Sequence, residues 1–444
     1  MNTPAPHRPS PRAPVVAFFP EASFGAALNC VGIAQALAAR GARPLFICHP
    51  GFTGIFAGYG FAEVHLPGPA ASSDYWQDFI DRHRPHFGLS PLDQLDTYVA
   101  PTWEAIVDTV IEAEEPLTQA IAQARPDLLV LDNVVMFPAV ARAGCPWVRV
   151  VSCAETEVPD ANVPPYLSGL STEDRAACDR FAATYRRVTA PAHARYNAFR
   201  RARGLPPLPP GQFLEPSGAL NLLLTPACVR HDRAVPLDPA TWRYLEGCVR
   251  DEAAFDLPAL TPPDAPVVYV SFGSLGATDT ALMARMLPVF GRIAARFVVN
   301  VGPHLDAFSA VPDNVALGTW FPQPSVVARS DLFIHHGGNN SFCEALFHGV
   351  PSLVMPYAWD GHDNARRAGQ TGTGAALHRS DWTDEGLRAA IETLLGDDAM
   401  RRRLRAGAAR MQASPGTAAA AEAILSVLAP APVAPVAPVA PIRG

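Results

Sequence analysis

The fold class of this 444-residue chain is decided by the stretch Leu332-Phe333-Ile334-His335-His336-Gly337-Gly338-Asn339-Asn340-Ser341-Phe342-Cys343-Glu344. It begins as a short apolar run without polar alternation, which is typical of a strand buried on both faces of a parallel sheet. Two histidines and two glycines follow, and a helical pattern begins near Ser341. A strand that passes through a glycine turn into a helix is the repeating unit of an α/β fold.

The same alternation extends in both directions from this stretch. Strands are predicted at 15–19, 45–48, 128–131, 147–151, 220–224, 267–272, 297–301, 332–335 and 352–355. Helices are predicted at 27–39, 104–123, 280–295, 341–348, 384–395 and 398–411. This series predicts two Rossmann-like, doubly wound parallel-sheet domains that face each other across a cleft. Ligands of such folds bind beyond the carboxyl ends of the strands.

Prolines mark the expected boundaries, because they cluster between residues 225 and 265 and at both ends of the chain. The predicted segments are a disordered leader, 1–13, an N-terminal domain, 14–235, a linker, 236–265, a C-terminal domain, 266–415, a last helix, 416–428, and a disordered Pro/Ala-rich tail, 429–444. The two proline-rich ends have the composition of extended chain rather than of a packed core.

Composition excludes several classes of function. The formal net charge is −7, so no broad basic surface is expected for nucleic acid. All basic residues other than histidine are arginine, which excludes a Schiff-base lysine, a P-loop lysine and a lysine general base. The eight cysteines form no C-x-x-C pair, and no apolar run is long enough to span a membrane. The apolar stretch 15–19 is too short for a signal peptide, so we expect a cytoplasmic protein without membrane contact.

The helix that begins near Ser341 favours an anion site, because a helix start offers unpaired N–H groups and the positive end of the dipole. Glycines such as Gly338 let the backbone approach an anion closely, and one of the two histidines can add a charge-assisted hydrogen bond. Strand alternation places the two histidines on opposite sides. Ser341 and Glu344 also match a capping box, so a purely structural role stays open.

A second glycine turn, at Gly273-Ser274-Leu275-Gly276, follows the first strand of the C-terminal half and can supply further donors to a diphosphate. No D-x-D pair occurs in the chain, and the adjacent histidines have no third ligand at a suitable spacing. We therefore expect a diphosphate site without metal and without a resident cofactor.

At this point the motifs resemble a known family. They are Thr319-Trp320-Phe321-Pro322-Gln323, His336-Gly337-Gly338-Asn339-Asn340-Ser341-x-x-Glu344, Gly349-Val350-Pro351, Pro356-x-x-x-Asp360 and Asn364. In order and spacing the set is similar to the donor-binding signature of the UDP-glycosyltransferase family, which belongs to the GT-B superfamily and includes bacterial natural-product enzymes. The resemblance implies an N-terminal acceptor-binding domain, a C-terminal nucleotide-sugar-binding domain and a last helix that crosses back onto the N-terminal domain.

The resemblance also implies a role for each donor-site residue. Trp320 would stack on the nucleobase, Gln323 would lie near base and ribose, and Glu344 would accept hydrogen bonds from ribose hydroxyls. Asp360 would bind hydroxyls of the transferred sugar. The residues implied to hold the diphosphate are Ser274, His336, Gly338, Asn340 and Ser341.

Two departures from the family pattern stand out. Gly361 replaces a glutamine that binds the sugar, which favours a deoxysugar or another donor over a common hexose, unless His362 compensates. Ala26 stands where the family has its catalytic histidine. Asp132, at the end of a strand, and Glu21, in the first loop, are the candidate replacement bases. For Asp132 the alternative is a cap on a helix beginning near Val134.

Aromatic residues between 74 and 103 either line an apolar acceptor pocket or pack an ordinary helical excursion. They are Tyr75, Trp76, Phe79, Phe87, Tyr98 and Trp103. The resulting hypothesis is an inverting glycosyltransferase, monomeric or homodimeric, that moves a sugar from a UDP- or dTDP-sugar to a hydroxyl of a lipophilic small molecule. A non-catalytic nucleotide-sugar-binding helper protein is the alternative, because of Ala26. An epimerase or hydrolase on a similar scaffold is a third interpretation.

Overall fold

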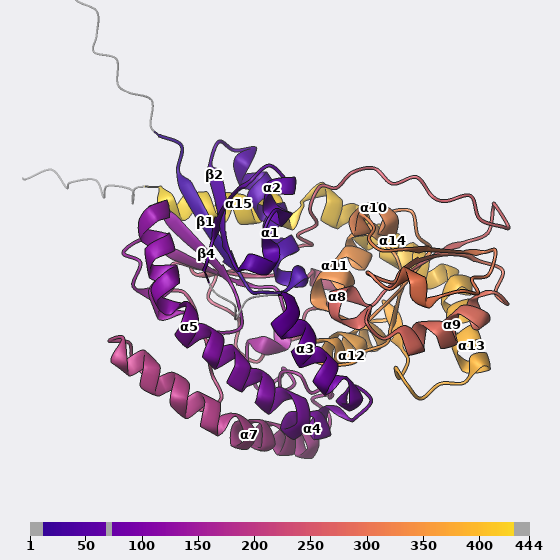
Figure 1. The fold of residues 1–444 in the computed structure, drawn as a ribbon, viewed down its shortest axis with the longest axis horizontal. Coiled ribbons are helices and arrows are strands. Elements are labelled where there is room, and N and C mark those ends of the chain that lie inside the picture. The colour runs from indigo at the N-terminus through magenta and orange to yellow at the C-terminus, as the bar shows by residue number, and fades with distance from the viewer. Residues whose placement is uncertain (1–11, 68–72, 430–444) are drawn as a thin grey trace, which may run out of the picture.

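The computed structural model describes residues 12–67 and 73–429 of the chain, without the side chains of residues 73–77, 274 and 275. It has two α/β lobes, each built on a parallel sheet (Figure 1). The leader and tail expected to be disordered fall almost entirely outside the described residues.

The N-terminal sheet has seven strands in the order β3-β2-β1-β4-β5-β6-β7. The strands are β1 Val15–Pro20, β2 Arg43–Cys48, β3 Ala62–His65, β4 Leu128–Asp132, β5 Trp147–Val151, β6 Leu220–Leu223 and β7 Trp242–Tyr244. The helices of this half are α1 Phe24–Ala38, α2 Ile55–Gly58, α3 Ser73–His83, α4 Pro91–Gln94, α5 Ala100–Ala124, α6 Pro138–Ala141 and α7 Arg175–Ala202.

The C-terminal sheet has six strands in the order β10-β9-β8-β11-β12-β13. The strands are β8 Val267–Ser271, β9 Arg296–Asn300, β10 Val315–Gly318, β11 Leu332–His335, β12 Ser352–Val354 and β13 Gly374–Ala376. The helices are α8 Gly273–Gly276, α9 Thr280–Phe290, α10 Gln323–Val327, α11 Asn339–His348, α12 Gly361–Thr371, α13 Asp384–Gly396, α14 Asp398–Ala413 and α15 Gly416–Leu428. The expectation of two doubly wound parallel sheets is confirmed.

The sheets lie between layers of helices, and their strands are buried on both faces. In β1, Ala17 and Phe19 pack into one apolar cluster, and Val16 and Phe18 pack into another on the opposite face. This explains why the strand sequences lack polar alternation.

Short strands account for most of the differences from the sequence-based prediction. The elements β3, β7, β10 and β13 have three or four residues each and were not predicted. Strand β7 lies inside the expected linker and pairs with β6, so the N-terminal sheet extends to Tyr244, past the boundary expected at residue 235.

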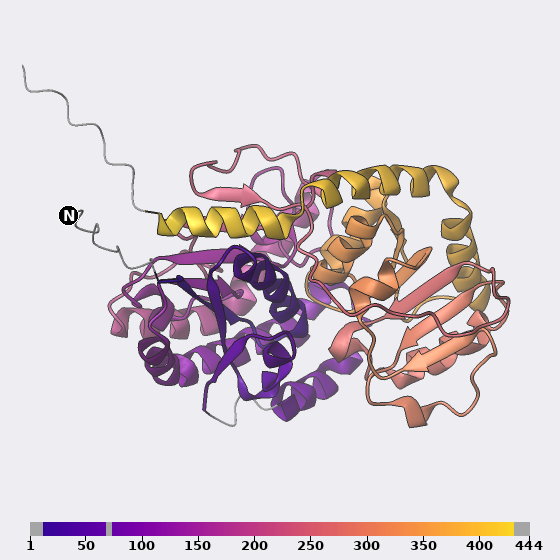
Figure 2. The same ribbon diagram turned by 90° about the horizontal axis from the view of Figure 1, so that it is seen from above.

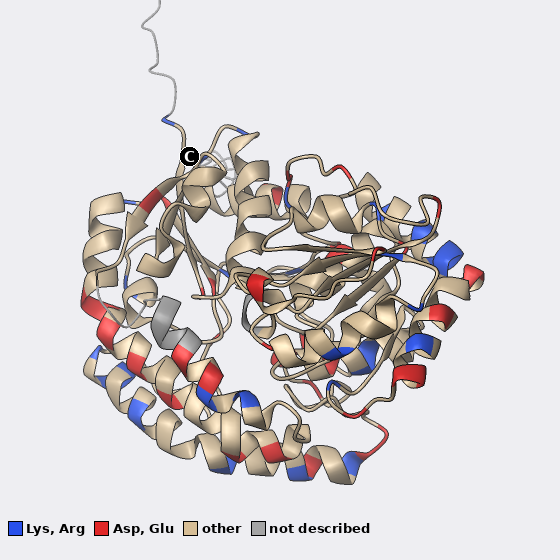
Figure 3. Cartoon of the chain, turned by 45° about the vertical axis from the view of Figure 1, so that its right-hand side comes forward, with Lys and Arg blue, Asp and Glu red and all other residues tan. Residues whose placement is uncertain are grey.

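The long helix α7 was also not predicted, because arginines crowd its sequence. It packs against α5, where Arg195 forms ion pairs with Glu104 and Asp108 at 3.0 Å. Charged residues lie mainly along these outer helices (Figure 3). One arginine of α7 is an exception to the solvated face, because Arg200 is 1% exposed and pairs with Glu215.

The last helix connects the two lobes. α15 follows α14 of the C-terminal half and lies along the N-terminal lobe, where it packs against α1 (Figure 2). Its residues Ala420, Ala421 and Ile424 are fully buried in the apolar cluster that includes Val31 and Leu37 of α1. The predicted return of this helix onto the N-terminal domain is confirmed.

Candidate active site

Each sheet has one switch point, where neighbouring strands connect onward in opposite directions. In the N-terminal sheet it lies between β1 and β4, and in the C-terminal sheet between β8 and β11. The loops that follow these four strands begin at Glu21, Asn133, Phe272 and His336. The carboxyl ends of the two sheets meet, since the side-chain amide of Asn339 donates to the carbonyl of Leu224 at 2.9 Å. A switch point is where an open α/β sheet binds its ligand.

His336 is packed between two glycine turns of the C-terminal switch point. A Cβ atom at Gly273 would lie 2.9 Å from Cε1 of His336, and one at Gly338 would lie 2.5 Å from Nε2. The ring of Tyr357 stacks on the imidazole at 5.2 Å. Both glycines are therefore required for the position of His336. The other histidine, His335, is fully buried in β11, as the strand alternation predicts.

His336 is neutral near pH 7. Burial, with the positive charge of Arg379, lowers its pKa to about 4. The charge-assisted hydrogen bond expected from this residue is therefore wrong, although a neutral imidazole still donates one N–H. Nδ1 is buried and has no hydrogen-bond partner among the described residues, which leaves Nε2, beside Gly338, to reach a ligand.

The start of α11 does not form the capping box. Gly338 is the N-cap residue, and the helix begins at Asn339, so Ser341 already lies in the first turn. The hydroxyl of Ser341 accepts a hydrogen bond from Nε2 of Gln323 at 3.1 Å. The first N–H of the helix, that of Asn339, donates to Oδ2 of Asp360 at 3.1 Å. The helix start therefore already attracts one carboxylate, and its first turn carries Asn340 and Ser341.

Asp360 lies beside the helix start in a strongly acidic environment. It is 9% exposed, and burial raises its pKa to about 7, with further contributions from the negative charges of Asp363, Glu21 and Glu157. Its neighbour Gly361 replaces the family's glutamine for a steric reason, because a Cβ there would lie 2.5 Å from the carbonyl oxygen of His336.

His362 does not take over the place of that glutamine. Its Nε2 atom pairs with Oε1 of Gln94 at 2.9 Å, which directs the ring toward the N-terminal half. The loss of one contact to the transferred sugar therefore remains uncompensated by this histidine.

Glu344 is the centre of a buried polar network. It is 1% exposed, and its carboxylate receives hydrogen bonds from Arg250 at 2.9 Å, Gln323 at 2.6 Å and Asn340 at 3.3 Å. Burial raises the pKa of Glu344, and the ion pair with Arg250 opposes that shift. Trp320, in the loop before α10, is 61% exposed. The side chain of Ser274, in α8, falls outside the described part of the chain.

The N-terminal switch point carries both candidate bases. The N–H of Glu21 donates to the carbonyl oxygen of Asp132 at 2.7 Å, so the two residues lie side by side. Glu21 is partly exposed, and burial together with the charge of Glu157 raises its pKa to about 7. A general base works best when its pKa is near the working pH. Ala26 lies in the first turn of α1 and is buried.

Asp132 is less available than Glu21. It is 2% exposed and accepts hydrogen bonds from Ser152 at 2.6 Å and from the thiol of Cys30 at 3.5 Å. Burial raises its pKa well above the usual range. The alternative role as a cap near Val134 is wrong, since the next helix, α6, begins at Pro138.

The aromatic residues expected at an acceptor pocket are mostly core. Phe79, Phe87, Tyr98 and Trp103 are at most 7% exposed and belong to one apolar cluster, so their packing alternative is confirmed. The side chains of Tyr75 and Trp76 lie outside the described residues. Two aromatic residues of the same cluster, Tyr166 and Trp359, are only partly buried, and their rings meet edge to face.

Comparison with known proteins agrees with this geometry. Residues 284–427 match the family of the erythromycin biosynthesis protein CIII-like, C-terminal domain. The oleandomycin glycosyltransferase of Streptomyces antibioticus is 26% identical over 419 residues, which cover 92% of this chain and 90% of that protein. The demethyllactenocin mycarosyltransferase of Streptomyces fradiae is 24% identical, with 95% and 88% covered.

Solved structures share the fold over the whole chain. The glycosyltransferase of kitacinnamycin has a TM-score of 0.70 at 22% identity, covering 95% of this chain and 100% of that one. A spinosyn rhamnosyltransferase complexed with thymidine diphosphate has a TM-score of 0.64 at 21% identity, with 93% and 100% covered. The chain belongs to the bacterial natural-product glycosyltransferases of the GT-B superfamily.

Several residues of the glycosyltransferase site were missed by sequence reasoning. Glu157 pairs with Arg149 at 2.5 Å close to Glu21, and Asp363 accepts hydrogen bonds from Thr156, Leu167 and Gly169 of the N-terminal half at 2.7–2.8 Å. Arg250 comes from the linker. Only Asp363 carried a signal, because it falls between Asp360 and Asn364 of the recognised motif.

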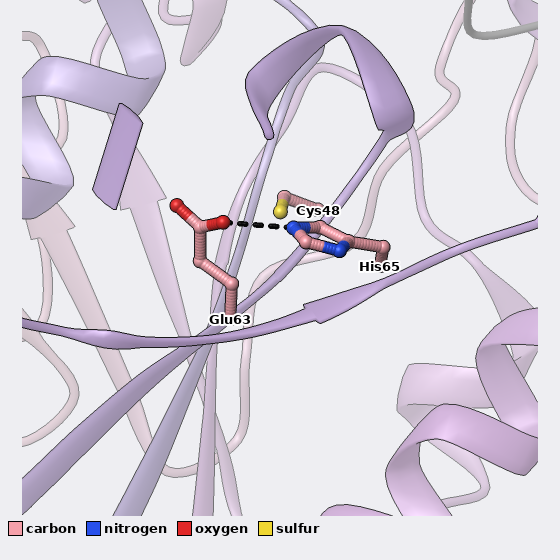
Figure 4. A group of neighbouring side chains, drawn as sticks. All are labelled: Cys48, Glu63 and His65. Atoms are coloured by element: carbon pink, nitrogen blue, oxygen red, sulfur yellow. Dashed lines mark hydrogen bonds and ion pairs between the residues drawn. The ribbon is translucent and has the colours of Figure 1, made fainter. Parts of the chain in front are cut away.

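One group outside this site brings potential metal ligands together in the glycosyltransferase. Among the described residues, ligand atoms of Cys48, Glu63 and His65 lie within 4.8 Å of one another (Figure 4). The carboxylate of Glu63 accepts from the N–H groups of Gly54 and Ala57 at 2.9 and 2.8 Å and pairs with His65 at 2.7 Å. Its hydrogen bonds thus fix the first turn of α2, which accounts for the arrangement without an ion.

The described helices also bear on the membrane question. None of those in residues 12–67 and 73–429 combines the length and apolarity that a membrane span requires.

Proposed function

We propose that this glycosyltransferase moves a sugar from a nucleoside diphosphate sugar to a hydroxyl of a lipophilic small molecule, with inversion at the anomeric carbon. The observation that carries the proposal is the pairing of two switch points. The start of α11, with His336 held between Gly273 and Gly338, faces a loop that carries Glu21 beside Asp132.

On the donor side, the diphosphate would lie at the start of α11. The helix dipole, the N–H of the neutral His336, and the polar side chains of Asn340 and Ser341 would stabilise the charge that develops on the leaving group. Trp320 would stack on the base, and Asp360 would bind the transferred sugar. Because these groups carry the stabilisation, the donor site needs no metal in this proposal.

The nucleoside is proposed to be thymidine or uridine. Support for thymidine comes from solved structures of the same fold whose titles name thymidine diphosphate as the bound nucleotide, a spinosyn rhamnosyltransferase and a second glycosyltransferase in complex with dTDP. Gly361, which cannot carry the family's glutamine, favours a deoxysugar as the transferred group.

On the acceptor side, Glu21 is proposed as the general base. It would take the proton of the acceptor hydroxyl as that oxygen attacks the anomeric carbon from the face opposite the diphosphate, and this single displacement inverts the configuration. Asp132 would support Glu21 from below. The partly buried rings of Tyr166 and Trp359 would contact an apolar acceptor. The named acceptors of the relatives, oleandomycin and demethyllactenocin, support a natural-product acceptor.

The test begins with thermal stability against a panel of UDP- and dTDP-sugars, with and without EDTA. A donor at about 100 times its dissociation constant adds about 2.7 kcal/mol of stability, and EDTA is expected to change nothing. The stabilising donor is then incubated with hydroxylated natural products, and the anomeric configuration of the product is read by NMR. Failure of every donor to shift the melting temperature of folded protein would reject the proposal. Binding without transfer to any acceptor would favour a helper protein instead.

A further inference from the structure

Arg250 is a buried cation at the ribose end of the donor site. Its side chain is 3% exposed and forms ion pairs with Glu344 at 2.9 Å and with Glu252 at 2.6 Å. Its Nε also donates to the hydroxyl of Tyr59 at 3.3 Å. A buried charge is tolerated only with such partners, because removing one leaves the guanidinium uncompensated in a low-dielectric surrounding.

The backbone of Arg250 is fixed to the N-terminal half. A Cβ atom at Gly32 of α1 would lie 3.1 Å from the backbone nitrogen of Arg250. The next residue, Asp251, exchanges two hydrogen bonds with the side chain of Gln35, at 2.8 and 3.1 Å. Arg250 therefore reaches Glu344 from a rigid position, and a ligand cannot move it aside without breaking these contacts.

The contact with Arg250 limits what Glu344 can accept. A carboxylate has two oxygens with about four acceptor sites. Oε1 already receives Arg250 and Asn340, whereas Oε2 receives Gln323 alone. Gln323 and Asn340 are neutral and partly exposed, so they can yield to a ligand at the cost of an ordinary hydrogen bond. Arg250 cannot, and it keeps Oε1 engaged.

We propose that Arg250 determines specificity for the nucleoside: by holding Oε1 of Glu344, it leaves one carboxylate oxygen for the sugar, which favours 2′-deoxyribose over ribose. Ribose presents adjacent 2′- and 3′-hydroxyls that would need both oxygens. A 2′-deoxyribose has the 3′-hydroxyl alone, which Oε2 can accept. The inference rests on the proposed placement of the nucleoside at Glu344.

The experiment compares UDP with dUDP, because these nucleotides differ only in the 2′-hydroxyl. Isothermal titration of the full-length protein is expected to give roughly tenfold tighter binding of dUDP, the effect of leaving one hydroxyl without its charged acceptor. In R250M, both oxygens of Glu344 become available, so the UDP affinity is expected to rise until the two dissociation constants agree within about twofold.

Two further variants guard against an effect of folding alone. R250K keeps a positive charge but has no planar fork to span Glu252 and Glu344, so it is expected to lower the dUDP preference partly. R200M removes another buried arginine, one paired with Glu215 in the N-terminal half, and is expected to leave the preference unchanged. Melting temperatures show which variants are folded.

The outcomes separate this inference from the proposed function. If folded wild-type protein binds neither nucleotide, the proposed donor site is wrong. If it binds both equally well, or if folded R250M and R250K keep the full preference for dUDP, the donor site stands and the role of Arg250 is overturned.

Discussion

At the carboxyl ends of β8 and β11, the glycosyltransferase presents glycine turns, a helix start and a neutral histidine. At the corresponding ends of β1 and β4 it gathers carboxylates instead. The two positions are equivalent in topology, since each is the switch point of a doubly wound sheet. One is suited to an anion and the other to taking a proton. The fold therefore sets where ligands bind, and the loop residues set which half of the reaction each position serves.

The acceptor side is broken by replacing Glu21. We expect E21Q to lower kcat by roughly 10²- to 10⁴-fold, the usual contribution of a general base, with little change in donor affinity. Steady-state kinetics and titration with the nucleotide measure the two effects separately. D132N is the comparison variant, because Asp132 is buried and already bonded to Ser152 and Cys30. A loss in D132N but not in E21Q would assign the base to Asp132.

The stability of E21Q provides a second readout. The folded-state pKa of Glu21 is raised from 4.5 to about 7, so ionising it opposes folding between these values and above them. E21Q is therefore expected to be more stable than the wild type above pH 7, and the difference is expected to vanish below about pH 4.5. Denaturant unfolding at several pH values checks this. A gain of the same size at every pH would contradict a raised pKa.

The two switch points should also respond to pH in opposite ways. Only about one in a hundred Glu21 side chains is ionised at pH 5 if the pKa is about 7, so kcat is expected to fall about hundredfold between pH 7 and pH 5. Asp360 loses its negative charge over the same range, while His336 stays neutral down to about pH 4. Diphosphate affinity is therefore expected to hold or increase as kcat falls. Parallel loss of both would show that the donor side titrates.

The same contrast explains how much the sequence could predict. The donor side is encoded locally, from Trp320 to Asn364, and its residue types and spacing were sufficient to place the helix start and His336. The acceptor side is assembled from distant segments. Glu157 approaches Glu21 only through the packing of β5 and its following loop, and nothing in the spacing of residues 21, 132 and 157 encodes that contact. The fold class was predictable from buried strands, whereas strands of three or four residues, such as β7, have too few residues to show a period.

The donor side is broken sterically by G338A. The added Cβ would lie 2.5 Å from Nε2 of His336, and the overlap can be relieved only by moving the histidine or the helix start. Such overpacking costs about 1–3 kcal/mol, so we expect roughly a thirtyfold loss in kcat/KM with the donor. G25A is the matched control, because a Cβ there meets nothing within 4 Å. Wild-type kinetics in G338A would mean that His336 has room that the packing does not indicate.

The smallest expected effect lies at the nucleobase end, where Trp320 is 61% exposed and offers one face. Base–aromatic stacking contributes about 1–3 kcal/mol, and a one-sided platform belongs at the low end, so we expect W320A to weaken nucleotide binding roughly tenfold. W320F keeps a ring and is expected to lose less. Because stacking acts equally on ground state and transition state, KM for the donor should rise while kcat stays near the wild-type value. A fall in kcat with unchanged KM would place Trp320 near the reacting sugar rather than the base, and would move the division between binding and chemistry within the donor half.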